Sequence, residues 1–359
     1  MSSAIATAAA TATATPLTFQ RSPALPRNCT FDSHDLEILS RYRHPVAFAA
    51  DVTDTPISVT LLDEPLVVFR SNGQLVSARD ICPYRGAPLS QGWVANDNIV
   101  CPYHGLAYGN DGKCKHIPSQ TDGPIPERLH LVTYSTQEAY GLVWVSLGGG
   151  AEALPAFPHW DDPDFQQILP PSIDINASAG RQTEGFIDVA HFAWIHHDSF
   201  ADRHNPVVPQ YSVERRKRGM HAEYVSTVSN FPKSMQHRAP EGYLWHRFFD
   251  VDVPFFARLT VHFPDNGRLS ILNAASPVSA RKTRLFVPIV RNFDKDLPLE
   301  DVYAFNRQVF EEDRAIVEQQ RPEDLPIDRA AEAPILADRS SGAYRRALAG
   351  IGLGQAYVR

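Results

Sequence analysis

The chain has 359 residues, a hydrophobic content of 43% and a formal net charge of -7. This length predicts about two domains, and the hydrophobic content is ordinary for a protein with a packed core. The acidic charge balance argues against nucleic acid or an anionic membrane as the main partner. The basic run Arg215–Arg218 is the one exception, and we interpret it as a solvated surface.

The cysteines and the N-terminus together suggest where the protein works. Four cysteines are too few for a disulfide scaffold in a chain of this size. No run of about 18 apolar residues is present, so no transmembrane helix is expected. Residues 1–30 are rich in Ala and Thr and then in Pro, without the basic and leucine-rich regions of a signal peptide. We therefore expect a disordered tail and a location in the reducing cytoplasm.

Residues 31–150 have the pattern of a small all-β domain preceded by a short helix. The stretch from Ser33 to Tyr42 offers a helix start, and strand-like runs separated by turn residues follow it. The dipeptide Asn72-Gly73 between two apolar runs predicts a hairpin. The run Gly141–Ser146 predicts a further buried strand. Two loops of this domain carry cysteine.

Residues 151–359 have a different character, after a boundary marked by Gly148–Gly150 and a Pro-rich segment. Residues 181–200 are compatible with helix, and several strand-like runs follow them. Apolar residues recur at helical spacing over residues 299–320. This order predicts an α+β domain in which an antiparallel sheet packs against a long helix.

A first group of candidate metal ligands lies in the two cysteine loops, Cys82-Pro-Tyr84-Arg-Gly and Cys101-Pro-Tyr-His104-Gly. Each loop supplies a thiolate, and its Pro and Gly let the backbone curl around a buried inorganic centre. Two such loops could hold a two-iron cluster between them. The alternative is a zinc site made of Cys82, Cys101, His104 and either Cys114 or His116.

A second group lies in the segment EGFIDVAHFAWIHH, residues 184–197. Asp188 and His191 are three residues apart and would share one face of a helix. His196 would lie about 140° away from His191 on an ideal helix, so convergence on one ion requires a break between them. Two imidazoles and one carboxylate form the facial triad of non-haem iron oxygenases. The alternative is a set of surface or core-lining histidines, and we interpret His197 in that way.

The cysteine loops resemble the Rieske ferredoxin-like domain, whose pattern is C-x-H followed by C-x-x-H. Cys82, Cys101 and His104 match this pattern, and Tyr84 stands where the family has histidine. The resemblance implies a [2Fe-2S] cluster with Cys on one iron and His on the other. Tyr84 could bind as phenolate, leave a position for water, or leave the cluster unstable.

The second group is similar to the catalytic motif D-x-x-H-x4-H of Rieske non-haem iron oxygenases, most closely the vanillate-demethylase-like monooxygenases. The resemblance implies that His191 and His196 bind a mononuclear Fe(II). It implies that Asp188 connects this iron to the Rieske domain of a neighbouring subunit. The family's third ligand is a carboxylate on a distant helix, and Asp313 falls at that position, with Glu312 as a weaker candidate.

The resemblance also implies the fold and the reaction. The fold is an all-β Rieske [2Fe-2S] domain plus an α+β helix-grip (START-like) catalytic domain. A head-to-tail homotrimer receives electrons from NAD(P)H through a separate reductase or ferredoxin. It uses O2 to hydroxylate, or to O- or N-demethylate, a small aromatic or heterocyclic substrate. We expect the pocket to be built from residues 200–290, with Asn273 and His262 facing the iron.

The competing hypothesis is a degenerate or cluster-impaired family member with a binding or regulatory role. Tyr84 favours this hypothesis, whereas the retained carboxylate and histidine positions argue against it. A third hypothesis is an introduced substitution, because His-to-Tyr is a single-base change.

Overall fold

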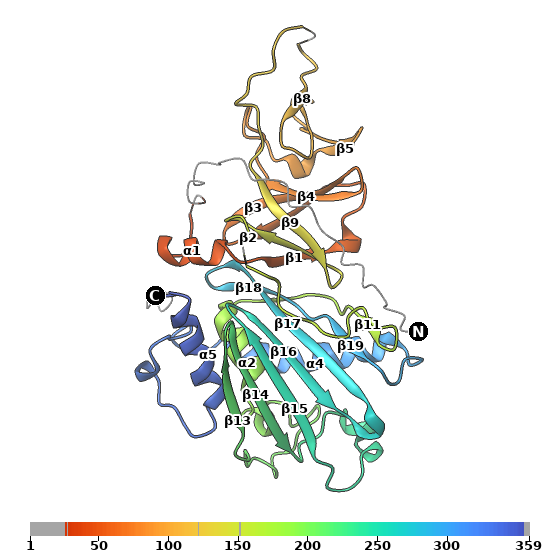
Figure 1. Cartoon of the computed structure of the whole chain (residues 1–359), viewed down its shortest axis with the longest axis vertical. Helices are drawn as coiled ribbons and strands as arrows, with labels where there is room; N and C mark the ends of the chain where they lie inside the picture. The colour runs from red at the N-terminus through yellow and green to blue at the C-terminus, as the bar shows by residue number, and fades with distance from the viewer. Residues whose placement is uncertain (1–25, 27, 121, 151, 355–359) are drawn as a thin grey trace, which may run out of the picture.

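The computed structural model describes residue 26 and residues 28–354, apart from residues 121 and 151. Three sheets are stacked along the longest axis of the molecule (Figure 1). A four-stranded sheet lies at one end, a nine-stranded sheet at the other, and a six-stranded sheet between them. The predicted disordered tail falls mostly outside the described residues and stays a prediction.

The six-stranded sheet follows α1 (Ser33–Ser40), which begins where Asp32 accepts a hydrogen bond from the backbone N–H of His34. Its central hairpin turns at Asn72 and Gly73, whose φ values of 50° and 74° suit a two-residue hairpin turn. This prediction is confirmed. The strand order is β1-β10-β9-β4-β3-β2, with β1 His44–Phe48, β2 Ile57–Leu61, β3 Glu64–Ser71, β4 Gln74–Arg79, β9 Thr133–Ala139 and β10 Leu142–Ser146.

The four-stranded sheet is inserted between β4 and β9 and carries the two cysteine loops. Its core contains the buried side chains of Cys82, Cys101 and Cys114, together with Leu89 and Tyr108. The strands are β5 (Trp93–Ala95), β6 (Asn98–Val100), β7 (Ala107–Tyr108) and β8 (Cys114–His116). The N-terminal half is thus all-β apart from α1 and short 3-10 turns, as predicted.

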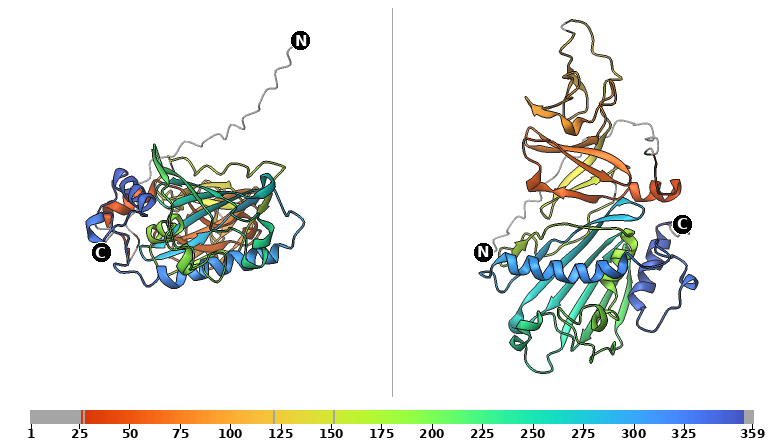
Figure 2. Two further views of the ribbon diagram at one scale, coloured as in Figure 1. Left: turned by 90° about the horizontal axis from the view of Figure 1, so that it is seen from below. Right: turned by 180° about the vertical axis from the view of Figure 1, so that it is seen from behind.

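The nine-stranded antiparallel sheet supports the helices of the second half. Helix α4 (Leu299–Val317) crosses one face of this sheet, and α5 (Arg339–Gly350) lies at its edge (Figure 2). The strands are β11 (Gln166–Ile168), β12 (Ile173–Ile175), β13 (Ser212–Arg216), β14 (Gly219–Ser226), β15 (Trp245–Asp252), β16 (Phe256–His262), β17 (Arg268–Ser279), β18 (Lys282–Phe286) and β19 (Ile289–Arg291). The predicted α+β architecture with a long helix is confirmed.

Strand alternation decides which side chains of this sheet face the helices. On β15 and β16 the side chains of Phe249, Ala257 and Val261 belong to the core under the helices. Phe256 points the other way and packs with Trp144 of β10, in the core between the two large sheets. Residues on opposite faces of this sheet therefore cannot share one pocket.

Helix α4 agrees with the predicted span to within three residues at its C-terminal end. Acidic Glu300 and Asp301 lie in its first turn and Arg314 in its last, which suits the helix dipole. In the part of the chain that the structure covers, no helix is both long enough and apolar enough to cross a membrane.

Candidate metal centres

The first candidate centre is built where one helix ends and another begins. Helix α2 (Ala179–Ile187) starts at Ser178, whose hydroxyl accepts a hydrogen bond from the N–H of Arg181. It ends at Asp188, whose backbone is extended, and α3 (Phe192–Ile195) begins only after His191. The helix is therefore broken between Asp188 and His191, so the expectation that these two residues share one face of a helix is wrong. The break expected between His191 and His196 is also wrong, because α3 fills that interval and the two imidazoles converge from its two ends.

Three predicted ligands meet beside this break. The Nε2 atoms of His191 and His196 lie 3.0 Å apart. Oδ1 of Asp313, on α4, lies 3.5 Å from the first and 3.2 Å from the second. Within the described ranges, these are the one set of three His, Cys, Asp or Glu side chains that converges closely enough to hold a metal ion.

Carboxylates hold the outer nitrogen of each histidine. Nδ1 of His191 lies 3.4 Å from Asp188, and Nδ1 of His196 lies 2.8 Å from Glu312. Ser199 also donates its hydroxyl to Glu312, at 2.7 Å. An Nδ1–H that donates to a carboxylate leaves the Nε2 lone pair free for a metal. The structure thus places Glu312 behind His196 as its hydrogen-bond partner.

The pair of Asp188 and His191 is electrostatically matched. Burial raises the pKa of Asp188. The hydrogen bond to His191, the charge of His191 and the N–H of Ala190, at 2.7 Å, lower this pKa by more than burial raises it. The pKa of Asp188 therefore lies below its ordinary value. Burial lowers the pKa of His191. The hydrogen bond to Asp188 and the negative charges of Asp313 and Asp188 raise this pKa by more, so it lies above its ordinary value. Two imidazole nitrogens and one carboxylate oxygen fit Fe(II) and leave positions open for other ligands.

Aromatic rings enclose the ligands. The ring of Phe200 stacks on His196 at 4.8 Å between centroids, and Phe192 lies edge-on to Phe200 at 5.6 Å. The buried guanidinium of Arg247 lies 5.5 Å from the centre of the Phe192 ring. These rings therefore cover part of the surface of the imidazoles.

The second candidate centre is formed by two loops with the same backbone pattern. Gly86 donates its N–H to the carbonyl of Cys82 at 2.8 Å, and Gly105 donates to the carbonyl of Cys101 at 3.0 Å. Both glycines have a positive φ, 74° and 70°, which other residues rarely adopt. The two loops therefore present their cysteines in equivalent ways.

The four residues of the predicted cluster site lie together at this tip. Cys82 and Cys101 are buried, while Tyr84 and His104 are exposed with ring centroids 5.0 Å apart. Burial and the neighbouring thiol of Cys82 raise the pKa of Cys101, although backbone hydrogen bonds oppose the shift. Two inner thiols and one outer imidazole fit a Rieske cluster, whereas the fourth position offers a phenol in place of an imidazole.

The zinc alternative finds no support in this geometry. The thiol of Cys114 packs in the small core and donates to the carbonyl of His116 at 3.5 Å, and the His116 side chain is exposed. Neither residue joins a convergent set of donors among the residues the structure describes.

The two expected substrate residues lie on opposite faces of the nine-stranded sheet. Asn273 on β17 is fully buried on the face that carries α2, and its Oδ1 accepts a hydrogen bond from Gln182 at 3.2 Å. His262 on β16 points to the other face, where its ring lies 4.8 Å from Phe248. The expectation that His262 faces the iron is therefore wrong, because strand alternation turns it away from the helices.

Some residues that contact the site residues were not anticipated from the sequence: Ser199 contacts Glu312, and Gln182 contacts Asn273. Ser199 and Gln182 belong to no motif, so only their contacts identify them. Glu312 was considered as a ligand because it precedes Asp313, but neighbouring helix residues point in directions about 100° apart. The sequence showed only that an acidic residue precedes Asp313. That observation could not distinguish an iron ligand from a residue that hydrogen-bonds to a ligand.

Comparison with known proteins identifies both halves of the chain. The Rieske [2Fe-2S] domain family matches residues 43–135, and the vanillate O-demethylase oxygenase C-terminal domain family matches residues 175–352. Methylxanthine N1-demethylase NdmA of Pseudomonas putida is 31% identical over 324 residues, which cover 86% of this chain and 88% of that protein. Methylxanthine N3-demethylase NdmB of the same species is 30% identical over 298 residues, 81% of each chain.

Solved structures have a similar fold. The structure of Pseudomonas putida CBB5 NdmA with caffeine has a TM-score of 0.77 and 28% identity, and covers 88% of this chain and 91% of its own. Dicamba monooxygenase bound to dicamba has a TM-score of 0.75 at 20% identity, covers 87% of this chain and 97% of its own, and supports the fold alone. The chain therefore belongs to the Rieske non-haem iron oxygenases, as an oxygenase (alpha) subunit.

Proposed function

We propose that the chain holds Fe(II) between His191, His196 and Asp313 and demethylates or hydroxylates a small aromatic or heterocyclic compound. The convergence of these three side chains is the observation that carries the proposal. The relatives NdmA and NdmB are methylxanthine N-demethylases, and other relatives are vanillate and dicamba O-demethylases. An N- or O-methyl substrate is therefore our first expectation.

The residues of the site would have separate tasks. The bound iron supplies the activation of dioxygen, with electrons from a reductase or ferredoxin through the cluster. His191 and His196 bind through Nε2, while Asp188 and Glu312 hold the protons on the outer nitrogens. Phe192 would exclude water from the imidazoles. With three positions on the iron taken by protein ligands, dioxygen would bind at the remaining positions and the substrate would lie beside them.

The substrate would meet a buried pair of amides. One hydrogen bond joins Gln182 and Asn273, and it leaves Oε1 of Gln182 and Nδ2 of Asn273 without partners in the described structure. Exchanging O and N in both amides still leaves one donor and one acceptor free. Buried polar groups require partners. A heterocycle with a ring carbonyl and a ring nitrogen would supply both.

The two centres would work together between copies of the chain. In one copy the four-stranded sheet that carries the cysteine loops lies at one end of the molecule, and α2 and α4 lie beyond the six-stranded sheet (Figure 1). His104 would reach Asp188 of a second copy, and such a head-to-tail contact can close as a homotrimer. The loop tip also exposes apolar Tyr84, Trp93 and Tyr103, at 45%, 50% and 65%, which a second copy would cover.

The second candidate function is that of a cluster-impaired member that binds a small molecule without turning it over. Tyr84 is the observation that favours it, because a phenol occupies the position of a cluster imidazole. In either case we propose a reducing cytoplasmic location. All four cysteines are free thiols in the structure, and thiols persist in such a compartment.

The test is a single turnover with chemically reduced protein. Anaerobically purified chain is loaded with Fe(II), reduced, and mixed with O2 and a panel of N-methyl heterocycles and O-methyl aromatic acids. Formaldehyde and the demethylated or hydroxylated product are then measured. We expect product from the native chain and none from His191→Ala. Absence of product from both the native chain and Tyr84→His, with iron bound, would support the binding role.

A further inference from the structure

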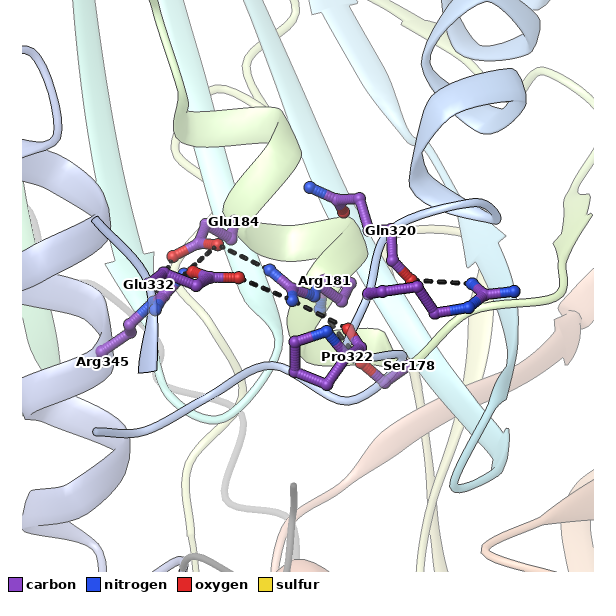
Figure 3. Close-up of polar contacts among 8 residues, drawn as sticks. Ser178, Arg181, Glu184, Gln320, Pro322, Glu332 and Arg345 are labelled. Carbon is purple, nitrogen blue, oxygen red and sulfur yellow. Dashed lines mark hydrogen bonds and ion pairs between the residues drawn. The ribbon is translucent and has the colours of Figure 1, made fainter. Parts of the chain in front are cut away.

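Four charged side chains, three of them buried, form a network that joins α2 to α5 and to the segment before α5 (Figure 3). Arg345 of α5 donates to both carboxylate oxygens of Glu184, at 2.7 and 2.8 Å, and to Glu332 at 2.5 Å. Arg181 donates to Glu332 at 2.8 Å and lies 3.7 Å from Glu184. The two arginines and two glutamates therefore alternate in a closed cycle of ion pairs, and their formal charges sum to zero.

This network joins segments that are far apart in the chain. Glu184 and Arg181 belong to α2, Glu332 to the connection between α4 and α5, and Arg345 to α5. Arg181 also donates to the carbonyl of Pro322, at 2.8 Å. The side chains of Arg181 and Arg345 are only 2% and 8% exposed. The side chain of Glu184 is 11% exposed and that of Glu332 is 32% exposed, so three of the four charges are buried. Burying three charges is costly, and apolar side chains could pack there without that cost, so stability alone does not explain the network.

Its position relative to Asp188 suggests what it does. Arg181, Glu184 and Asp188 are three and four residues apart, so they follow one face of α2. The N–H of Asp188 donates to the carbonyl of Glu184 at 3.0 Å, which closes the last turn of the helix. All three residues, with Glu332 and Arg345, line one pocket of about 190 Å³. Any movement of Glu184 would therefore move the turn that carries Asp188.

We propose that Arg345, Arg181 and Glu332 are positioning residues, which clamp Glu184 and thereby hold Asp188 in line between His191 and the partner copy. This inference rests on the proposed function only in assigning Asp188 to the contact with a second copy. The clamp acts on the last turn of α2 and touches neither the iron ligands nor the substrate amides. It is a device for orientation and leaves the metal site itself unchanged.

The test is a double-mutant cycle on single-turnover electron transfer from the cluster to the iron site. Arg345→Met keeps the length of the side chain but removes the fork, and Asp188→Asn removes the carboxylate. We expect Arg345→Met to slow the transfer roughly tenfold, with iron content and substrate affinity unchanged. The double variant should be no slower than Asp188→Asn alone. Multiplied effects of the two changes would overturn the proposal.

A second readout needs neither metal nor turnover. In hydrogen–deuterium exchange, Arg345→Met should speed the exchange of peptides over residues 180–190, and Arg345→Lys should do so less. Arg238→Met is the matched control, since it breaks the two-bonded pair with Asp294, which is not part of this network. Unchanged exchange over 180–190, or faster exchange throughout, would refute the clamp. If the native protein transfers no electrons from the cluster to the iron site, the proposed function fails. The hydrogen–deuterium exchange over residues 180–190 then still tests whether the network holds the last turn of α2.

Discussion

Replacing Glu312 by Gln tests whether this residue is an iron ligand or the partner of one. The carboxylate accepts from Nδ1 of His196 at 2.8 Å and from Ser199 at 2.7 Å. A hydrogen bond to a charged group contributes about 1.5–3 kcal/mol, and a neutral one about 0.5–1.5 kcal/mol. Losing the charge should therefore cost roughly 1–1.5 kcal/mol of iron binding, or about tenfold in Kd.

The magnitude distinguishes the two roles. Removing the side chain in Glu312→Ala should weaken iron binding further, toward the hundredfold loss typical of a ligand's hydrogen-bond partner. Asp313→Ala should abolish specific binding, because it removes a ligand. Glu311→Gln is the matched control on the same helix, since the carboxylate of Glu311 pairs with Arg314 at 2.5 Å.

The assay is Fe(II) titration against a chelator of known affinity, under anaerobic conditions. We expect Glu311→Gln to match the native chain and Glu312→Gln to fall between the native chain and Asp313→Ala. The reasoning is refuted if Glu312→Gln binds iron as tightly as the native protein. It is also refuted if Glu312→Gln loses iron as completely as Asp313→Ala, because Glu312 would then be a ligand.

Three further predictions follow from other parts of the structure. Asp188→Asn should slow cluster-to-iron electron transfer at least tenfold with both metal centres occupied; stopped-flow absorbance measures it, and an unchanged rate removes the bridge between copies. Tyr84→His should restore a spectrum with two His and two Cys ligands, and raise the reduction potential of the cluster, because a neutral imidazole replaces an anionic phenolate; an ordinary Rieske spectrum already present in the tyrosine form contradicts this. Burial lowers the pKa of His44 to about 4 from an ordinary 6.5. The unfolded chain then binds a proton in this window while the folded chain does not, so the free energy of unfolding should fall by up to about 3 kcal/mol as pH drops from 6.5 to 4. Urea unfolding at pH 7 and pH 5 should show a shallower loss in His44→Gln, and equal slopes exclude His44 as a cause.

Much of the fold was predictable where a local pattern matched the final structure. The Asn72-Gly73 turn has a backbone preference that fixes the hairpin, and the apolar spacing over residues 299–320 fixes the long helix. Strand β15 had no such clear pattern, because one of its buried positions is Arg247. That guanidinium can be buried because Ser226 and the carbonyls of Val228 and Ser229 accept its hydrogen bonds, which no sequence pattern reveals.

The convergence of His191, His196 and Asp313 was predictable from the sequence, but the residues around them were not. The sequence predicts a helix break between His191 and His196, whereas the structure has the break between Asp188 and His191. The orientation of His262 could not be predicted, because alternation along a strand does not say which face the helices cover. Helix α5 was also not predicted. It is held against the sheet in part by Tyr344, which is fully buried and donates a hydrogen bond to the carbonyl of Pro254, 90 residues away in the chain.

The most direct measurement is iron and acid-labile sulfide analysis of anaerobically purified protein, made together with the visible spectrum. The proposal predicts iron in excess of the amount that the sulfide accounts for, since a mononuclear site accompanies the cluster. His191→Ala should lose this excess and keep the cluster absorbance. An absence of excess iron in the native chain, or an excess that persists in His191→Ala, would contradict the assignment of His191, His196 and Asp313 as an iron site.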